Sequence, residues 1–155
     1  MGRGTKHKAL VVGAVEVRKS KAGRQYAGRV RMRVIANADR PTLNLFVQQS
    51  IVLGSLVRTD GWPAYDLGEL GYEHHSVLDR EAGGPGRDLP LIHREFSNLK
   101  TWLGGTHQGR VQRNHLQAYL NEFAFRHNRR FWKFSAFQRL LQLALVLQPI
   151  LVDFK

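Results

Sequence analysis

The stretch Leu91-Ile92-His93-Arg94-Glu95-Phe96-Ser97-Asn98-Leu99-Lys100 carries two parallel stripes when it is read as a helix. One stripe is apolar at helical spacing and consists of Ile92, Phe96, Leu99 and Leu103. The neighbouring stripe consists of His93, Ser97 and Lys100. The spacing predicts a helix over Leu91 to Leu103, which Gly104-Gly105 ends. The apolar stripe would pack in the core. It would thereby fix the positions of a ligand-type residue, His93, and a cation, Lys100, on the neighbouring stripe.

Asp60 lies upstream at the end of an apolar run, where Gly54 to Thr59 predicts a short strand, and it precedes a glycine. A strand-end Asp that faces a helix-borne ligand is a common way to hold a divalent metal against a phosphodiester. Two plainer interpretations stay open. Asp60 on its own suits a turn or an N-cap, and His93 on its own suits a helix start or an exposed surface.

Charge indicates the class of partner. The 155 residues contain 24 Lys and Arg against 12 Asp and Glu, a net charge of +12. Such an excess favours a polyanion, most simply nucleic acid. Solubility alone, or a ribosomal or membrane-surface setting, is the alternative. There is no Cys, so disulfides and thiolate metal sites are excluded.

The basic residues form two groups that we predict to contact DNA. Val30, Met32 and Val34 alternate with arginines, which predicts a half-buried strand with a basic outer face. The alternative for the basic face of this strand is a solvated edge strand. The second group lies near the end of a predicted helix, and its alternative is a solvated helix end. The predicted DNA-binding arginines are Arg29, Arg31, Arg33, Arg126, Arg129 and Arg130.

The order of predicted elements indicates an α/β fold in a single domain, residues 1–155, with a basic N-terminus over 1–8. Strands are expected at Leu10–Val17, Arg29–Val34, Gly54–Thr59 and Tyr72–Leu78. Helices are expected from Asp39-Arg40-Pro41-Thr42 to about Ser50, at Pro63–Leu70, at Leu91–Leu103, at Gln112–Arg130 and from Ser135 onward. In the last helix, Phe137, Leu140, Leu141, Ala144 and Leu145 are expected to be core residues.

The apolar stretch at the C-terminus, Leu140 to Val152, is interrupted by Gln142, Gln148 and Pro149. It is shorter than the roughly 20 residues that a bilayer requires. The N-terminal apolar run, Ala9 to Val15, leads into Glu16 and makes a poor signal peptide. The expected location is the cytoplasm, in association with the nucleoid, and no membrane partner is expected.

Several segments in this order resemble the catalytic domain of bacterial insertion-sequence transposases of the ISXO-like group. They are Val11-Val12-Gly13-Ala14-Val15-Glu16, Arg29 to Val34, Val57-Arg58-Thr59-Asp60-Gly61-Trp62, Tyr65, Gly71-Tyr72-Glu73-His74, His93 to Leu103, Gly105-Thr106-His107 and His115-Leu116-Gln117-Ala118-Tyr119-Leu120-Asn121-Glu122-Phe123 to Asn128-Arg129-Arg130. The resemblance covers roughly residues 9 to 140. It implies an RNase H-like fold of the DDE type, with a mixed sheet flanked by helices and a helical C-terminal part.

The resemblance also implies roles for individual residues. Asp60 matches the second catalytic Asp, and His93 stands where most members have the catalytic Glu, although some use His. Lys100 matches a Lys on the same helix and would meet a DNA phosphate as a point charge. Asp60 and His93 would be metal ligands for Mg²⁺ or Mn²⁺. An imidazole ligand shifts the preference away from Mg²⁺, towards Mn²⁺ or Zn²⁺.

One departure concerns the first catalytic Asp of the family. That residue lies on a strand that precedes the match to Val11–Val17, and here no Asp occurs before Asp39. The same strand is central in the family's sheet, between the matches to Val11–Val17 and Val57–Thr59. The chain is therefore expected to be N-terminally truncated, with a gap in its sheet. Glu16 is the nearest acidic residue, but the match places it on the wrong strand.

The resemblance implies metal-dependent DNA cleavage and strand transfer in transposition, catalytically incomplete in this chain. The implied partners are transposon ends, target DNA and further copies of the chain in a homo-oligomer. A basic DNA-binding protein or remnant without catalytic activity is the alternative.

Overall fold

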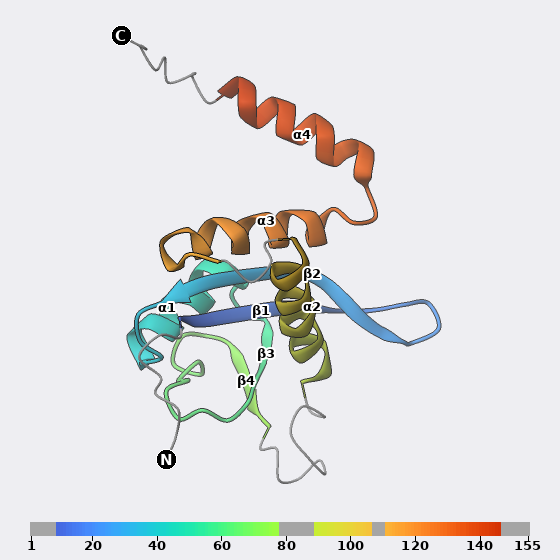
Figure 1. Ribbon diagram of the computed structural model, residues 1–155. Helices are drawn as coiled ribbons and strands as arrows, with labels where there is room; N and C mark the ends of the chain where they lie inside the picture. The colour runs from blue at the N-terminus through green and yellow to red at the C-terminus, as the bar shows by residue number, and fades with distance from the viewer. Residues whose placement is uncertain (1–8, 78–88, 107–110, 147–155) are drawn as a thin grey trace.

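The computed structural model describes residues 9–77, 89–106 and 111–146. The described chain is a small α/β structure with two two-stranded sheets and four α-helices (Figure 1). The structure pairs β1 with β2 and, separately, β3 with β4, which is compatible with the mixed fold that the sequence predicts. No helix among these residues is long and apolar enough to cross a membrane.

The hairpin of β1 (Leu10–Lys19) and β2 (Gln25–Ile35) is antiparallel, and its register shifts between Val15 and Val17. Its turn contains Gly23 at φ +77°, a conformation that favours glycine. Val30 and Met32 are buried, which confirms the predicted inner face of β2.

Helix α1 (Arg40–Ser50) begins where the sequence predicts, because the Asp39 side chain accepts a hydrogen bond from the Thr42 backbone N–H at 3.0 Å and Pro41 occupies the first turn. Its buried residues join one side of the hairpin, β3 (Leu56–Thr59) and the loop after β3 in a first core. The buried members of that core are Val12, Ile35, Leu43, Phe46, Val47, Val57, Leu67 and Tyr72.

Strand β3 runs parallel to β4 (Glu73–Ser76). The helix predicted over Pro63–Leu70 is wrong, because the segment forms successive turns instead. Backbone N–H groups there bond three residues back, from Tyr65 to Trp62 O and from Leu70 to Leu67 O. Leu67 is fully buried, so packing of this one side chain fixes the segment without a helix.

The second core lies on the other side of the hairpin, under α2 (Pro90–Thr106) and α3 (Leu116–Asn128), which follows a 3-10 turn at Arg113–His115. Its buried members are Val30, Met32, Leu99, Leu120 and Phe123. The hairpin is therefore the middle layer between α1 and the α2–α3 pair (Figure 1). Helix α2 continues through Gly104-Gly105, two residues that the sequence predicts to end it.

Side-chain amides of α3 occupy the outer edge of β2. Asn128 Oδ1 accepts from the Val30 N–H at 2.7 Å, and Asn128 Nδ2 donates to the Val30 carbonyl at 3.0 Å. Gln117 Oε1 accepts from the Val34 N–H at 2.9 Å. These amides satisfy backbone groups that a further strand would otherwise pair, so α3 protects this edge from strand addition.

Helix α4 (Lys133–Val146) differs from its prediction. Phe137, Leu140 and Leu141 are expected to be core residues, but they are 63%, 51% and 49% exposed. The prediction is wrong because an apolar stripe shows that a helix face needs a partner but not where that partner lies. Within the described residues, α4 extends away from the rest of the molecule (Figure 1). The positions of Ala144 and Leu145 fall outside the described side chains.

Candidate nucleic-acid interface

Asp60 follows β3 at the surface and serves as a turn residue. Its Oδ1 accepts a hydrogen bond from the Trp62 backbone N–H at 3.3 Å, and Gly61 between them has φ +76°. The Trp62 indole donates to the Ala38 carbonyl at 3.0 Å, which ties the turn to the loop before α1. The turn interpretation of Asp60 thus has geometric support, while its carboxylate stays exposed.

The polar stripe of α2 is exposed as the sequence predicts, but the buried residues of the helix are Leu91, Glu95 and Leu99, so of the predicted apolar stripe only Leu99 is buried. Leu99 is buried, and Ile92 and Phe96 lie so close to Gly13 of β1 that a Cβ there would be 3.0 Å from the Phe96 ring. His93 and Lys100 are exposed on the other stripe. Close packing against Gly13 therefore fixes the helix and the direction in which its polar stripe faces.

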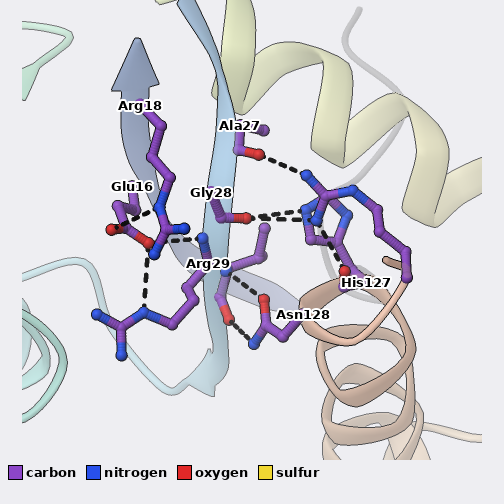
Figure 2. Close-up of polar contacts among 9 residues, drawn as sticks. Glu16, Arg18, Ala27, Gly28, Arg29, His127 and Asn128 are labelled. Carbon is purple, nitrogen blue, oxygen red and sulfur yellow. Dashed lines mark hydrogen bonds and ion pairs between the residues drawn. The ribbon is translucent and has the colours of Figure 1, made fainter. Parts of the chain in front are cut away.

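The described residues do not assemble a metal site. Among them, no group of three or more His, Asp or Glu residues could hold an ion. Glu16 is engaged elsewhere: it accepts from the Arg29 backbone N–H at 2.9 Å and pairs with the Arg18 guanidinium at 3.0 Å (Figure 2). Within residues 9–77, 89–106 and 111–146, the donor set does not fit the paired metals implied by the resemblance.

These contacts give Glu16 a structural role with a pH signature. The Arg29 backbone hydrogen bond is the main cause that lowers the pKa of Glu16 from 4.5 to about 2. A depressed carboxyl pKa contributes stability that is present above 4.5 and is lost as the pH falls towards 2. We expect Glu16→Gln to lose about 1 kcal/mol or less of the free energy of unfolding at pH 7, because the side chain is a third exposed.

Chemical denaturation of parent and variant from pH 7 to pH 2 checks this expectation. The difference between the two proteins should shrink below pH 4.5. A difference that stays constant down to pH 2 would show that Glu16 does not stabilise the hairpin through its charge.

A groove of about 330 Å³ lies between β2, α1 and α3. Arg31 and Arg33 line it from β2, and Arg129 lines it from the end of α3, so both predicted basic groups contribute. Side-chain amides of Gln49, Gln117, Asn121 and Asn128 complete its polar lining. Guanidinium groups are the usual donors of phosphate contacts in nucleic-acid interfaces.

Aromatic rings hold two of these arginines in place. The Arg129 guanidinium lies 4.0 Å above the centre of the Phe125 ring, and the Arg33 guanidinium lies 6.0 Å from the centre of the Phe46 ring and donates to Gln49. Arg31 is exposed and makes no hydrogen bond or ion pair within the described part of the chain. A stacked cation keeps its charge and most of its donors, so the groove presents three cations to a ligand.

The other predicted DNA-binding arginines have partners within the protein. Arg29 pairs with Glu16, and Arg126 pairs with Glu122 at 2.8 Å. The Arg130 guanidinium donates to backbone carbonyls of Ala27, Gly28 and His127. The structure therefore brings three of the six arginines into one groove and places Arg130 in a stabilising role.

The sequence did not reveal one buried polar pair. Glu95 on α2 is 2% exposed, and its Oε2 lies 3.1 Å from His127 Nδ1 on α3. The His127 Nε2 faces the Gly28 carbonyl at 3.2 Å (Figure 2), and burial lowers the pKa of His127. The sequence signal for a buried Glu95 was its position four residues after Leu91 and four residues before Leu99, which places it on the same helix face as these two apolar residues.

Comparison with known proteins gives one family. A family model described as the ISXO2-like transposase domain matches residues 1–128, from the start of the chain to the end of α3. No curated protein and no solved structure matches the chain.

Proposed function

Because the chain belongs to the family of ISXO2-like transposase domains, we propose that it binds DNA in transposition through the groove between β2, α1 and α3. The observation that carries this proposal is the convergence of Arg31, Arg33 and Arg129, from segments about 100 residues apart, on one polar groove. The net charge of +12 supplies the long-range attraction for a polyanion.

We propose an RNase H-like arrangement for the two sheets. Val12 of β1 and Val57 of β3 belong to one core under α1, so the two strands lie on the same side of that helix. The family's central strand would lie between β1 and β3 and join the two sheets into one. The antiparallel hairpin and the parallel β3–β4 pair are consistent with this topology.

Asp60, His93 and Lys100 are the proposed catalytic residues for phosphoryl transfer. Lys100 is exposed on the same stripe of α2 as His93 and would hold a phosphate oxygen. Asp60 would supply an oxygen ligand and His93 a nitrogen ligand to a metal ion. Among the described residues, no third Asp, Glu or His forms a group with them that could hold the ion. We therefore propose that this chain alone does not cleave DNA and that a further acidic residue is needed.

A thermal melt with Mn²⁺ tests the catalytic part of the proposal. We expect millimolar Mn²⁺ to leave the melting temperature of the parent chain unchanged, as it would leave that of the Asp60→Ala variant. Binding to the native state alone would raise the melting temperature by mass action. A rise in the parent that Asp60→Ala removes would show an assembled metal site and contradict the proposal.

The second candidate is a DNA-binding protein with no catalytic role, which the three-arginine groove supports equally. Supplying the family's first strand, with its Asp, separates the two candidates. A transposase domain should then nick duplex DNA in Mn²⁺, and Asp60→Ala should abolish the nicking. A DNA-binding protein should bind the same duplex and leave it intact.

A further inference from the structure

Two amide side chains in the groove between β2, α1 and α3 have their oxygens engaged and their amino groups free. Gln49 Oε1 accepts from the Arg33 guanidinium, and Asn121 Oδ1 accepts from Gln117 Nε2 at 2.8 Å. Within residues 9–77, 89–106 and 111–146, the amino groups of Gln49 and Asn121 donate no hydrogen bond. Each of these amides therefore offers donors to a ligand, one from α1 and one from α3.

The remaining amides that line the groove are engaged on β2. Asn128 uses both of its polar side-chain atoms on the backbone of Val30, and Gln117 bonds to the Val34 N–H and to Asn121. These contacts hold α3 on the edge of the strand and fix the walls of the groove. The polar groups left to meet a ligand are cations and amide donors, and they fit a ligand that presents acceptors.

The hollow shape of the groove limits which part of a DNA molecule can reach these amides. The base edges of a duplex lie at the floor of its major groove, about 8.5 Å deep, where a projecting helix or β-ribbon reads them. Here the amides line a groove of about 330 Å³, which receives a projecting group and does not enter a second groove. Duplex phosphates lie outermost and can meet the arginines, but a base reaches the amides only when it projects from the duplex as an unpaired nucleotide.

The same wall of the groove offers a plane on which an unpaired base can stack. Asn121, Phe125 and Arg129 follow one another at spacings of four residues, so they lie along one face of α3 and its end. The Arg129 guanidinium lies 4.0 Å above the centre of the Phe125 ring. Guanidinium planes and aromatic rings are the usual stacking partners of unpaired bases. The stacking plane and an amide donor therefore lie side by side.

We propose that this groove takes up one unpaired nucleotide of DNA and prefers guanine over adenine. The inference rests on the proposed function, because the DNA held by the arginines presents the nucleotide. Guanine carries two acceptors, O6 and N7, on one edge, whereas adenine has an amino donor in place of O6. The amino groups of Gln49 and Asn121 donate to the guanine acceptors, and one of them would face the adenine amino group donor to donor. The base stacks on Arg129, while Arg31 and Arg33 contact the neighbouring phosphates.

Fluorescence anisotropy in 0.1 M salt tests the inference on the parent chain with three DNAs. One is a fully paired 20-base-pair duplex, and the others carry one extra nucleotide, guanine or adenine, at the centre of one strand. We expect the extra guanine to strengthen binding about tenfold over the paired duplex, through stacking and two hydrogen bonds. The extra adenine should bind about fivefold more weakly than the extra guanine.

A double variant tests the two amides. Gln49→Met with Asn121→Leu removes both amino groups and should bring the ratio of guanine to adenine affinity to about one. The ratio is measured within each variant, so a general loss of DNA affinity does not alter it. The matched control is Gln48→Met with Asn114→Leu, the same changes on exposed residues that do not line the groove, and it should keep the preference.

The possible failures separate this inference from the proposed function. Equal affinity of the parent chain for the three DNAs would overturn the inference and leave the proposed function standing, because phosphate contacts alone would then account for binding. Absence of binding to all three would overturn both. A preference for guanine that the Gln49 and Asn121 variant keeps, or that the control variant also loses, would contradict the assignment to these amides.

Discussion

Replacing Glu95 with alanine is expected to lower the free energy of unfolding by about 1–3 kcal/mol, the usual cost of leaving a buried hydrogen-bonding group without its partner. Glu95 is 2% exposed and faces His127, and Asn98 Nδ2 also donates to its Oε2 at 3.2 Å. The alanine variant leaves the largely buried His127 Nδ1 without this partner, whereas the exposed Asn98 amide can bond to water instead. At roughly 2–4 °C per kcal/mol for a chain of this size, the melting temperature should fall by about 5 °C.

Glu95→Gln is the matched control. A carbonyl oxygen only accepts, so His127 Nε2 carries a hydrogen towards Gly28 and one proton lies between Nδ1 and Glu95 Oε2. Burial lowers the pKa of His127 and favours the neutral ring. A glutamine amide can donate to a neutral Nδ1 and accept from Asn98, so this variant should lose less than half of what alanine loses. Equal losses in the two variants would contradict this hydrogen-bond arrangement.

Reversing two charges of the groove should produce the largest effect on binding. We expect Arg31→Glu with Arg129→Glu to weaken binding to a DNA duplex at least 100-fold in 0.1 M salt. Each change removes a cation that would contact phosphate and adds a charge that repels it. Neither arginine takes part in the cores, so the melting temperature should change little.

Fluorescence anisotropy with a labelled 20-base-pair duplex measures this effect. The matched control is Lys21→Glu with Arg24→Glu, which changes the net charge equally on exposed residues of the hairpin that do not line the groove. If both double variants weaken binding to the same extent, net charge and not the groove determines affinity.

Local patterns in the sequence were sufficient where one segment determines its own structure. The alternation of Val30 and Met32 with arginines predicted β2, and Asp39 before Pro41 predicted the start of α1. The helix α2 and its exposed polar stripe were also predicted, because helical spacing fixes which side chains share a face, but its buried residues are Leu91, Glu95 and Leu99.

Features that depend on distant segments were not predicted. Glu95 and His127 are brought together only by the packing of α2 on α3, and helical spacing places each on an apolar face without showing which residue it meets. The turns over Pro63–Leu70 depend on burial of Leu67 by other elements. Convergence of the two basic groups on one groove likewise follows from α3 lying along β2.

The salt dependence of duplex binding by the parent chain tests the central claim most directly. Each phosphate that the protein neutralises contributes about −0.9 to the slope of log K against log salt concentration. The three arginines of the groove therefore predict a slope of about −3 or steeper between 0.05 and 0.3 M salt, and Arg31→Ala with Arg129→Ala should reduce its magnitude by about 2. A slope between 0 and about −1, or a slope that the double variant leaves unchanged, would contradict a DNA-binding role for this groove.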